Sequence, residues 1–346
     1  MDLKHLLKRG ALLAAANWQS VAIQFVAETT FQVLLAVPVI GAAVLIAVLL
    51  GADLAELLQG SLRDIFTTVA SALLSEPVAL VAFITAFTLV LCGGSVLMFA
   101  VKGGTVDVLI AANDAAGAIE QGPITYDRLR SAARFSLERF TGGCTRLFRR
   151  YLALGAALMV VYGLSGGAYL AFVVYGYRAT GDRVFIIGWA LIAAFAAIAL
   201  VIWITVVNLV YLLMQVAMAV EDLPIGAASR AVGRFVRDEF RELVGVFLVV
   251  LGLLVAAMLA SALAWSGVGL IAFVPLVGLA VFPLQIAALL LRGFVFEYLG
   301  LTALGAYITL YTRHLQSRVA PADREVLPSA TRAAERWRFG PSRSKS

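Results

Sequence analysis

Two charged residues inside an otherwise apolar stretch have the strongest claim to chemistry. Between Leu243 and Thr312 the only charged side chains are Arg292 and Glu297. An ionisable group in a membrane span is costly, and such groups often line ion or substrate pathways. The two residues are five positions apart, so on a straight helix they are offset by about 140° and do not face each other. The favoured interpretation is that Arg292 marks the outer interface and that Glu297 pairs with another helix.

Amide side chains in apolar stretches form a second group of candidates. Asn208, Gln215 and Gln285 can each hydrogen-bond to a neighbouring helix, which is the commoner use of such groups in membrane proteins. The alternative is a polar bundle interior that serves a transporter or channel. Glu28 is expected at the cytoplasmic surface.

The remaining reactive residue types are few and scattered. His5 and His314 lie among basic residues at cytoplasmic edges and are expected to be solvated, and Cys92 and Cys144 have no metal-ligand spacing. No nucleophile motif, phosphate-binding loop or dinucleotide fingerprint is present. The sequence therefore predicts no catalytic, cofactor-binding or metal-binding residues, and the protein is not expected to be an enzyme.

The composition is that of a membrane protein. The chain has 346 residues, of which 62% are hydrophobic and 14% charged, whereas soluble domains carry about 25% charged residues. Long uncharged runs lack the alternation of barrel strands. The predicted fold class is all-α, a polytopic membrane helical bundle.

Charge distribution predicts the topology. Of the 27 Lys and Arg residues, 23 fall within 1–30, 102–150, 219–242 and 313–346, and basic residues are retained on the cytoplasmic side. A single membrane domain over 1–312 is expected in a bacterial inner membrane, with both termini and a basic tail (313–346) in the cytoplasm. About six spans are expected, near 31–50, 78–101, 151–175, 185–216, 243–265 and 289–312. The segment 267–291 contains Pro275 and Pro283, and we expect it to be broken or re-entrant on the outer side.

Two basic segments have helical amphipathic periodicity. Apolar residues within 223–242 recur at spacings of three and four, and Arg230, Arg234, Arg237 and Arg241 follow the same period on another face. A segment within 123–141 has a similar pattern and contains Arg134 and Arg139. Both are expected to be cytoplasmic interfacial helices whose arginines contact anionic lipid. Residues 1–28 resemble a weaker copy, so the chain can be parsed as three tandem hairpins, each preceded by an amphipathic helix; chance similarity is the alternative.

Several short motifs resemble those of a bacterial family. The run AVEDLP at 219–224 is followed by Ala227, Ala228, Ser229 and Arg230, and Phe240 precedes a span. The last span ends with AYITLY at 306–311 and then Arg313. These motifs are similar to those of six-helix YciC-like proteins and of the membrane domain attached to some glycerophosphoryl diester phosphodiesterases. The resemblance covers about a third of the chain and implies a bacterial inner-membrane architecture without an assigned activity.

The sequence therefore predicts an integral inner-membrane protein with a lipid-associated, membrane-organising or accessory role. Membrane lipids and other membrane proteins are the expected partners, and nucleic acid is not. A transporter or channel that uses the polar bundle interior is the alternative function.

Overall fold

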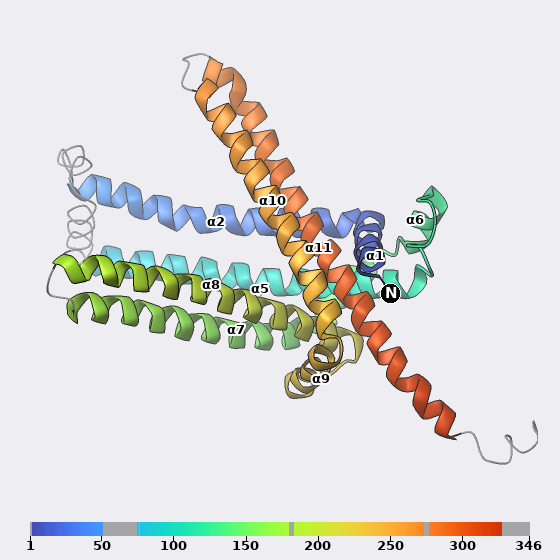
Figure 1. The fold of residues 1–346 in the computed structure, drawn as a ribbon. Helices are drawn as coiled ribbons and strands as arrows, with labels where there is room; N and C mark the ends of the chain where they lie inside the picture. Colours follow the sequence, from blue (N-terminus) through green and yellow to red (C-terminus); the bar gives the residue numbers. More distant parts are fainter. Residues whose placement is uncertain (1, 51–74, 76, 180–182, 273–276, 327–346) are drawn as a thin grey trace, which may run out of the picture.

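The protein is built from helices. The computed structural model describes residues 2–50, 75, 77–179, 183–272 and 277–326, and within these residues there is no strand (Figure 1). In chain order the helices are α1 (Leu3–Ala16), α2 (Trp18–Leu50), α5 (Pro77–Ala115), α6 (Tyr126–Ala132), α7 (Leu137–Ala179), α8 (Arg183–Val220), α9 (Ile225–Asp238), α10 (Phe240–Ala272) and α11 (Val277–Val326).

Within the described residues, the order of short and long helices repeats three times. A short helix precedes each pair of long ones, giving α1–α2–α5, α6–α7–α8 and α9–α10–α11. The chain has six helices that are long and apolar enough to cross a membrane, counted over the described residues. The α10–α11 pair runs at an angle to the other four long helices (Figure 1). The fold is thus an all-α polytopic membrane bundle.

The buried core lies at one end of the bundle, which we call the packed end. It joins α1, the start of α2, Ala132 of α6, the second halves of α5, α8 and α11, the first halves of α7 and α10, and the apolar face of α9. Its largest fully buried side chains include Leu13, Leu109, Tyr151, Phe235 and Tyr311. The three short helices therefore cover a core to which all three hairpins contribute.

The outer halves of the long helices expose their apolar side chains. Val78, Leu89 and Phe195 are each more than 70% exposed. Soluble proteins rarely expose apolar patches of this extent. Hydrocarbon is the environment that accommodates such surfaces, because a helix there satisfies its own backbone hydrogen bonds.

A buried polar network ties the first hairpin to the last. Arg9 on α1 forms an ion pair with Glu120 at 2.8 Å, and both side chains are nearly buried. Arg9 Nε also donates to Asn113 Oδ1 at 3.0 Å, and the same oxygen accepts from Thr309 on α11 at 3.0 Å. Because each buried charge has a partner, the desolvation of the pair is offset.

Asn17 connects two helix breaks, the one between α1 and α2, where it lies, and the one between α6 and α7, which its side chain contacts. It separates α1 from α2, is fully buried, and its Nδ2 donates to Leu13 O and to Ala132 O, at 2.9 and 3.1 Å. Its Oδ1 accepts from the backbone N–H groups of Arg134 and Phe135, at 2.8 and 3.0 Å. The side chain thus satisfies backbone groups at the break between α6 and α7, which buried peptide groups require.

The structure redraws several predicted boundaries. The expected interfacial helix over 1–28 is divided at Asn17, and the segment 123–141 contains α6, a break and the start of α7 because Asn17 bonds the backbone there. The segment 267–291 belongs to α10 up to Ala272 and to α11 from Val277, so no separate re-entrant element is seen in its described residues. Helix α11 also continues into the predicted tail, as far as Val326.

The crossing of α1 over α11 depends on glycine. A Cβ atom at Gly10 would lie 2.3 Å from the carbonyl oxygen of Thr302 and 2.9 Å from the amide nitrogen of Ala306. Both are backbone atoms, so neither can move away as a flexible side chain would. The two helices can approach this closely only while position 10 lacks a side chain.

We expect Gly10→Ala to destabilise the protein by about 1–3 kcal/mol, as is typical of overpacking. The matched control is Gly163→Ala on α7, where an added Cβ meets nothing within 4 Å and helix propensity favours alanine. Thermal unfolding in detergent measures both. An unchanged melting temperature for Gly10→Ala would contradict the close crossing.

Candidate functional site

Glu297 belongs to a charged cluster between α2, α5 and α11. Its carboxyl group interacts with the side chains of Glu28 and Gln24 on α2 and, through space, with Lys102 on α5. Lys102 in turn interacts electrostatically with both Glu28 and Glu297. We call Glu28, Lys102 and Glu297 the charged trio. The sequence predicted that Glu297 pairs with another helix, and in the structure its neighbours lie on α2 and α5.

Two members of the trio were not expected from the sequence. Lys102 was assigned to a basic cytoplasmic segment, and Glu28 to the surface. In the structure Lys102 lies 25 residues into the uninterrupted helix α5 (Pro77–Ala115), and Glu28 lies ten residues into α2. The signal in the sequence was that Lys102 directly follows the uncharged run 77–101, with no proline between Val78 and Lys102 to end the helix.

Among the described residues, the ammonium group of Lys102 has no ion-pair partner. Lys102 is partly buried, and its Nζ lies 5.9 Å from the centre of the Tyr211 ring. In the part of the chain that the structure describes, no carboxylate oxygen lies within the 4.0 Å of an ion pair. Lys102 therefore keeps hydrogen-bond donors that can serve a ligand.

A cavity of about 340 Å³ adjoins Lys102 and is lined by residues of α2, α5, α8, α10 and α11. Its polar lining comprises Gln24, Lys102, Thr105, Thr205, Asn208 and Gln215. The rest is mostly apolar, including Phe247, Val250, Leu251 and Leu254 of α10 and Leu301, Leu304 and Tyr307 of α11. The structure thus brings the predicted residues Asn208 and Gln215 to one cavity.

The two predicted amides are satisfied to different degrees. Asn208 Oδ1 accepts a hydrogen bond from the hydroxyl group of Tyr162. Gln215 is 1% exposed, and its Nε2 has no hydrogen-bond partner; the buried hydroxyl group of Tyr211 also lacks one. An unpaired buried donor is unfavourable by about 1–3 kcal/mol, so an acceptor supplied by a ligand would be stabilising here.

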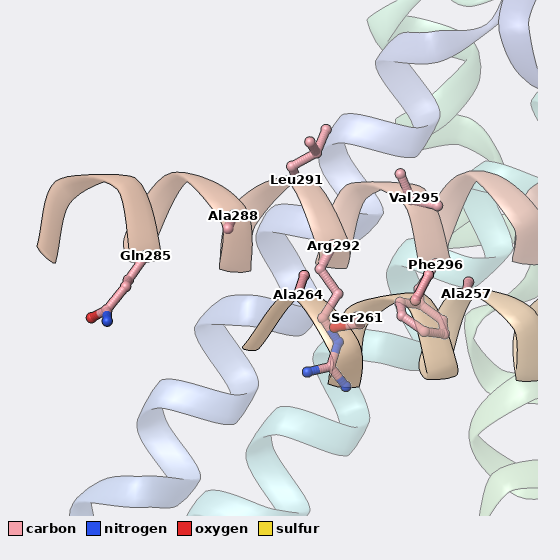
Figure 2. A pocket seen from close by; sticks show the side chains of 10 residues that line it. Ala257, Ser261, Ala264, Gln285, Ala288, Leu291, Arg292, Val295 and Phe296 are labelled. Carbon is pink, nitrogen blue, oxygen red and sulfur yellow. The ribbon is translucent and has the colours of Figure 1, made fainter. Parts of the chain in front are cut away.

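Arg292 and Gln285 lie elsewhere. They line a separate pocket of about 330 Å³ between the outer parts of α10 and α11. Figure 2 shows Arg292 extending from α11 towards Ser261 on α10, and its guanidinium lies 5.6 Å from the centre of the Phe296 ring. Arg292 and Glu297 therefore lie in different environments: Arg292 lines the outer pocket, and Glu297 belongs to the charged trio.

The predicted arginine row is exposed on α9 and the start of α10. Arg230, Arg234, Arg237 and Arg241 are all exposed, while Ala228, Ala231, Val232 and Phe235 on the opposite face are buried in the core. Among the described residues no carboxylate forms an ion pair with these four guanidinium groups. Arg134 and Arg139 are exposed near the α6–α7 break, where Arg139 donates to the backbone oxygen of Arg134 at 3.2 Å.

Two arginines near the end of α11 form ion pairs with acids of α9, α10 and the turn between them. Arg318 contacts Asp238 at 2.6 Å, and Arg313 contacts Glu242 and Glu239. His314, expected as a solvated side chain, is 5% exposed and packs against Phe235. These contacts explain why α11 extends beyond residue 312.

Asp222 receives two arginines at the junction of α8 and α9. Arg150 lies 2.5 Å from its carboxylate, and Arg146 lies 3.8 Å from it. Hydrogen bonding to Arg150 holds the pKa of this exposed carboxyl group below its ordinary value. The four arginines of the α9 row have no such carboxylate partner within the described residues; Arg230 Nε donates to the backbone oxygen of Gly226 at 3.2 Å.

The fold and the cavity define a class, an α-helical polytopic membrane protein with a partly polar cavity near its packed end. No family model matches the chain, and neither the curated proteins nor the solved structures contain a match. Within the described residues, no group of three His, Cys, Asp or Glu side chains has the geometry to hold a metal ion.

We expect Lys102→Met to destabilise the protein, because the two neighbouring carboxyl groups then lose the electrostatic attraction of the ammonium group. Adding Glu297→Gln should recover part of the loss, since it removes one of the two carboxyl groups left without that cation. Thermal unfolding of the two single variants and the double variant gives a coupling free energy, which we expect to be about 1–3 kcal/mol. Additive effects would show that the trio does not act as a unit.

Proposed function

We propose that the protein is a lipid-associated integral membrane protein with a membrane-organising or accessory role. The observation that carries the proposal is the α9 row, in which four exposed arginines have no carboxylate partner among the described residues. The apolar face of α9 is held in the core, so the row is fixed in orientation at the packed end. Phosphate groups of anionic lipids are the natural counterions of such a row.

The packed end is assigned to the cytoplasmic side of a bacterial inner membrane. The basic segments of the sequence meet there, and basic residues near spans are retained in the cytoplasm. The resemblance to bacterial six-helix proteins supports this setting. A non-enzymatic role fits the scarcity of clustered acid–base groups, and other membrane proteins are the further partners proposed.

The topology can be checked by cysteine labelling in a variant that lacks Cys92 and Cys144. Gln121→Cys at the packed end should react with a membrane-impermeant reagent only after the inner membrane is opened. Arg178→Cys at the far end of α7 should react in spheroplasts with an intact inner membrane. Both positions are exposed, so the opposite pattern would reverse the orientation.

Replacing Arg230, Arg234, Arg237 and Arg241 together with Gln should reduce retention of anionic lipid. Each basic side chain near a membrane contributes about 1 kcal/mol, so we expect a reduction of more than tenfold. The measurement is the ratio of phosphatidylglycerol to phosphatidylcholine retained by the purified full chain in native mass spectrometry. The fourfold Lys variant is the matched control and should retain the lipid, because it keeps the charge. Equal retention by the Gln variant would refute the proposed role.

A transporter is the second candidate, and the observation in its favour is the charged trio beside the cavity. Proton or solute flux in reconstituted vesicles, abolished by Glu297→Gln, would support it. Vesicles that stay impermeable would favour the lipid-associated role.

A further inference from the structure

The donor groups at the cavity lack acceptors. Lys102 has no ion pair within 4.0 Å in the described part of the chain, and Gln215 Nε2 is buried without a partner. These groups come from different helices, α5 and α8, and line the same cavity. A cation and a buried amide donor together match a ligand with an anionic oxygen, because such a bond is charge-assisted and satisfies both.

The neighbouring carboxyl groups do not fill this role. Glu28 faces Lys102 from α2 and Glu297 faces it from α11. The two carboxyl groups interact with each other, Glu297 also with Gln24, and Glu28 accepts from Gln32 at 3.2 Å. They therefore moderate the positive charge of Lys102 without occupying its donors.

The remaining lining indicates an amphiphile rather than a small soluble anion. Phe247, Val250, Leu251 and Leu254 supply an apolar wall on α10. The same helix continues outward with exposed Val255, Met258 and Leu259, so the cavity wall runs onto a surface suited to hydrocarbon. A volume of about 340 Å³ is at the lower end of ligand sites, enough for a headgroup region while the chains stay in the bilayer.

We propose that this cavity binds one membrane phospholipid with an anionic headgroup, whose phosphate oxygens contact Lys102 Nζ and Gln215 Nε2. The acyl chains leave along the apolar face of α10. The inference rests on the proposed lipid association and deepens it by adding a single site between the helices that is distinct from the exposed arginine row. Its affinity is less sensitive to salt than that of the row, because partly buried charges are screened less than exposed ones.

The test measures phosphatidylglycerol bound to the purified full chain by native mass spectrometry at about 1 M salt, where the Debye length is about 3 Å and surface binding is screened. The wild type should keep one tightly bound lipid. Gln215→Leu should weaken it at least tenfold, although the lipid-free melting temperature should not fall, since the variant removes an unpaired buried donor. Loss of the lipid together with a lowered lipid-free melting temperature would overturn the assignment to Gln215.

Lys102 is tested in a background that keeps the trio balanced. Lys102→Met combined with Glu297→Gln should lose the bound lipid, and Lys102→Arg should retain it. The matched control is Arg292→Met, which removes a cation that lines the other pocket and should leave binding unchanged. Wild-type affinity in both the Gln215 and Lys102 variants would overturn the proposal.

Two further arms separate the ligand sources and the two proposals. Phosphatidylcholine should bind at least tenfold more weakly, and inorganic phosphate should not displace the lipid; displacement would assign the site to a soluble anion and overturn the lipid proposal. The fourfold Gln variant of the α9 row should keep the single lipid at high salt. If that variant loses the lipid at high salt, the site is part of the surface row and the cavity proposal fails. If the variant keeps the single lipid at high salt and also retains as much lipid as the wild type at low salt, the proposed function fails and the cavity site stands.

Discussion

Helices in hydrocarbon gain no hydrophobic free energy by packing against one another, because lipid tails are as apolar as their side chains. The outer halves of the six long helices reflect this constraint in their exposed apolar surfaces. Their arrangement is instead determined at the packed end, where a buried core, the Arg9–Glu120 pair and the Asn17 side chain connect the hairpins. The short helices α1, α6 and α9 supply much of this connection, so they are structural parts of the bundle rather than attachments to it.

Charge at the packed end serves three different purposes. Arg313 and Arg318 are paired with acids on α9 and α10 and hold the inner part of α11 in place. The α9 row remains open to its surroundings. The trio of Glu28, Lys102 and Glu297 lies between helices, with an ammonium group available to the cavity. The two lipid proposals rest on the second and third sets: the arginine row is exposed, and Lys102 is partly buried beside a cavity.

Much of the architecture followed from the sequence, because long uncharged runs between basic segments leave few alternatives to a six-helix membrane bundle. The 3.6-residue period of the α9 segment was equally informative, and the structure buries one face of it. The break between α6 and α7 was not predictable, since it depends on hydrogen bonds from Asn17 more than 100 residues away. Lys102 was missed for another reason: a charge at the end of an apolar run was taken as the end of the helix. The burial of His314 was also missed, because it depends on packing against Phe235 and on the approach of Asp238 and Glu239, which are more than 70 residues away in the sequence.

The contact between α1 and α11 has a consequence for biogenesis. The hydroxyl group of Tyr298 donates to the carbonyl oxygen of Ala11, a separation of 287 residues. At translation rates of about 5–20 residues per second, the partner surface of α1 is completed roughly 15–60 s after α1 itself. Contacts of α1 with Asn113 and Glu120 can form before that, but the side of α1 that packs against α11 stays uncovered during the interval. Docking of α11 onto α1 is therefore a late step in assembly, and a chain that stops before α11 leaves that side of α1 exposed.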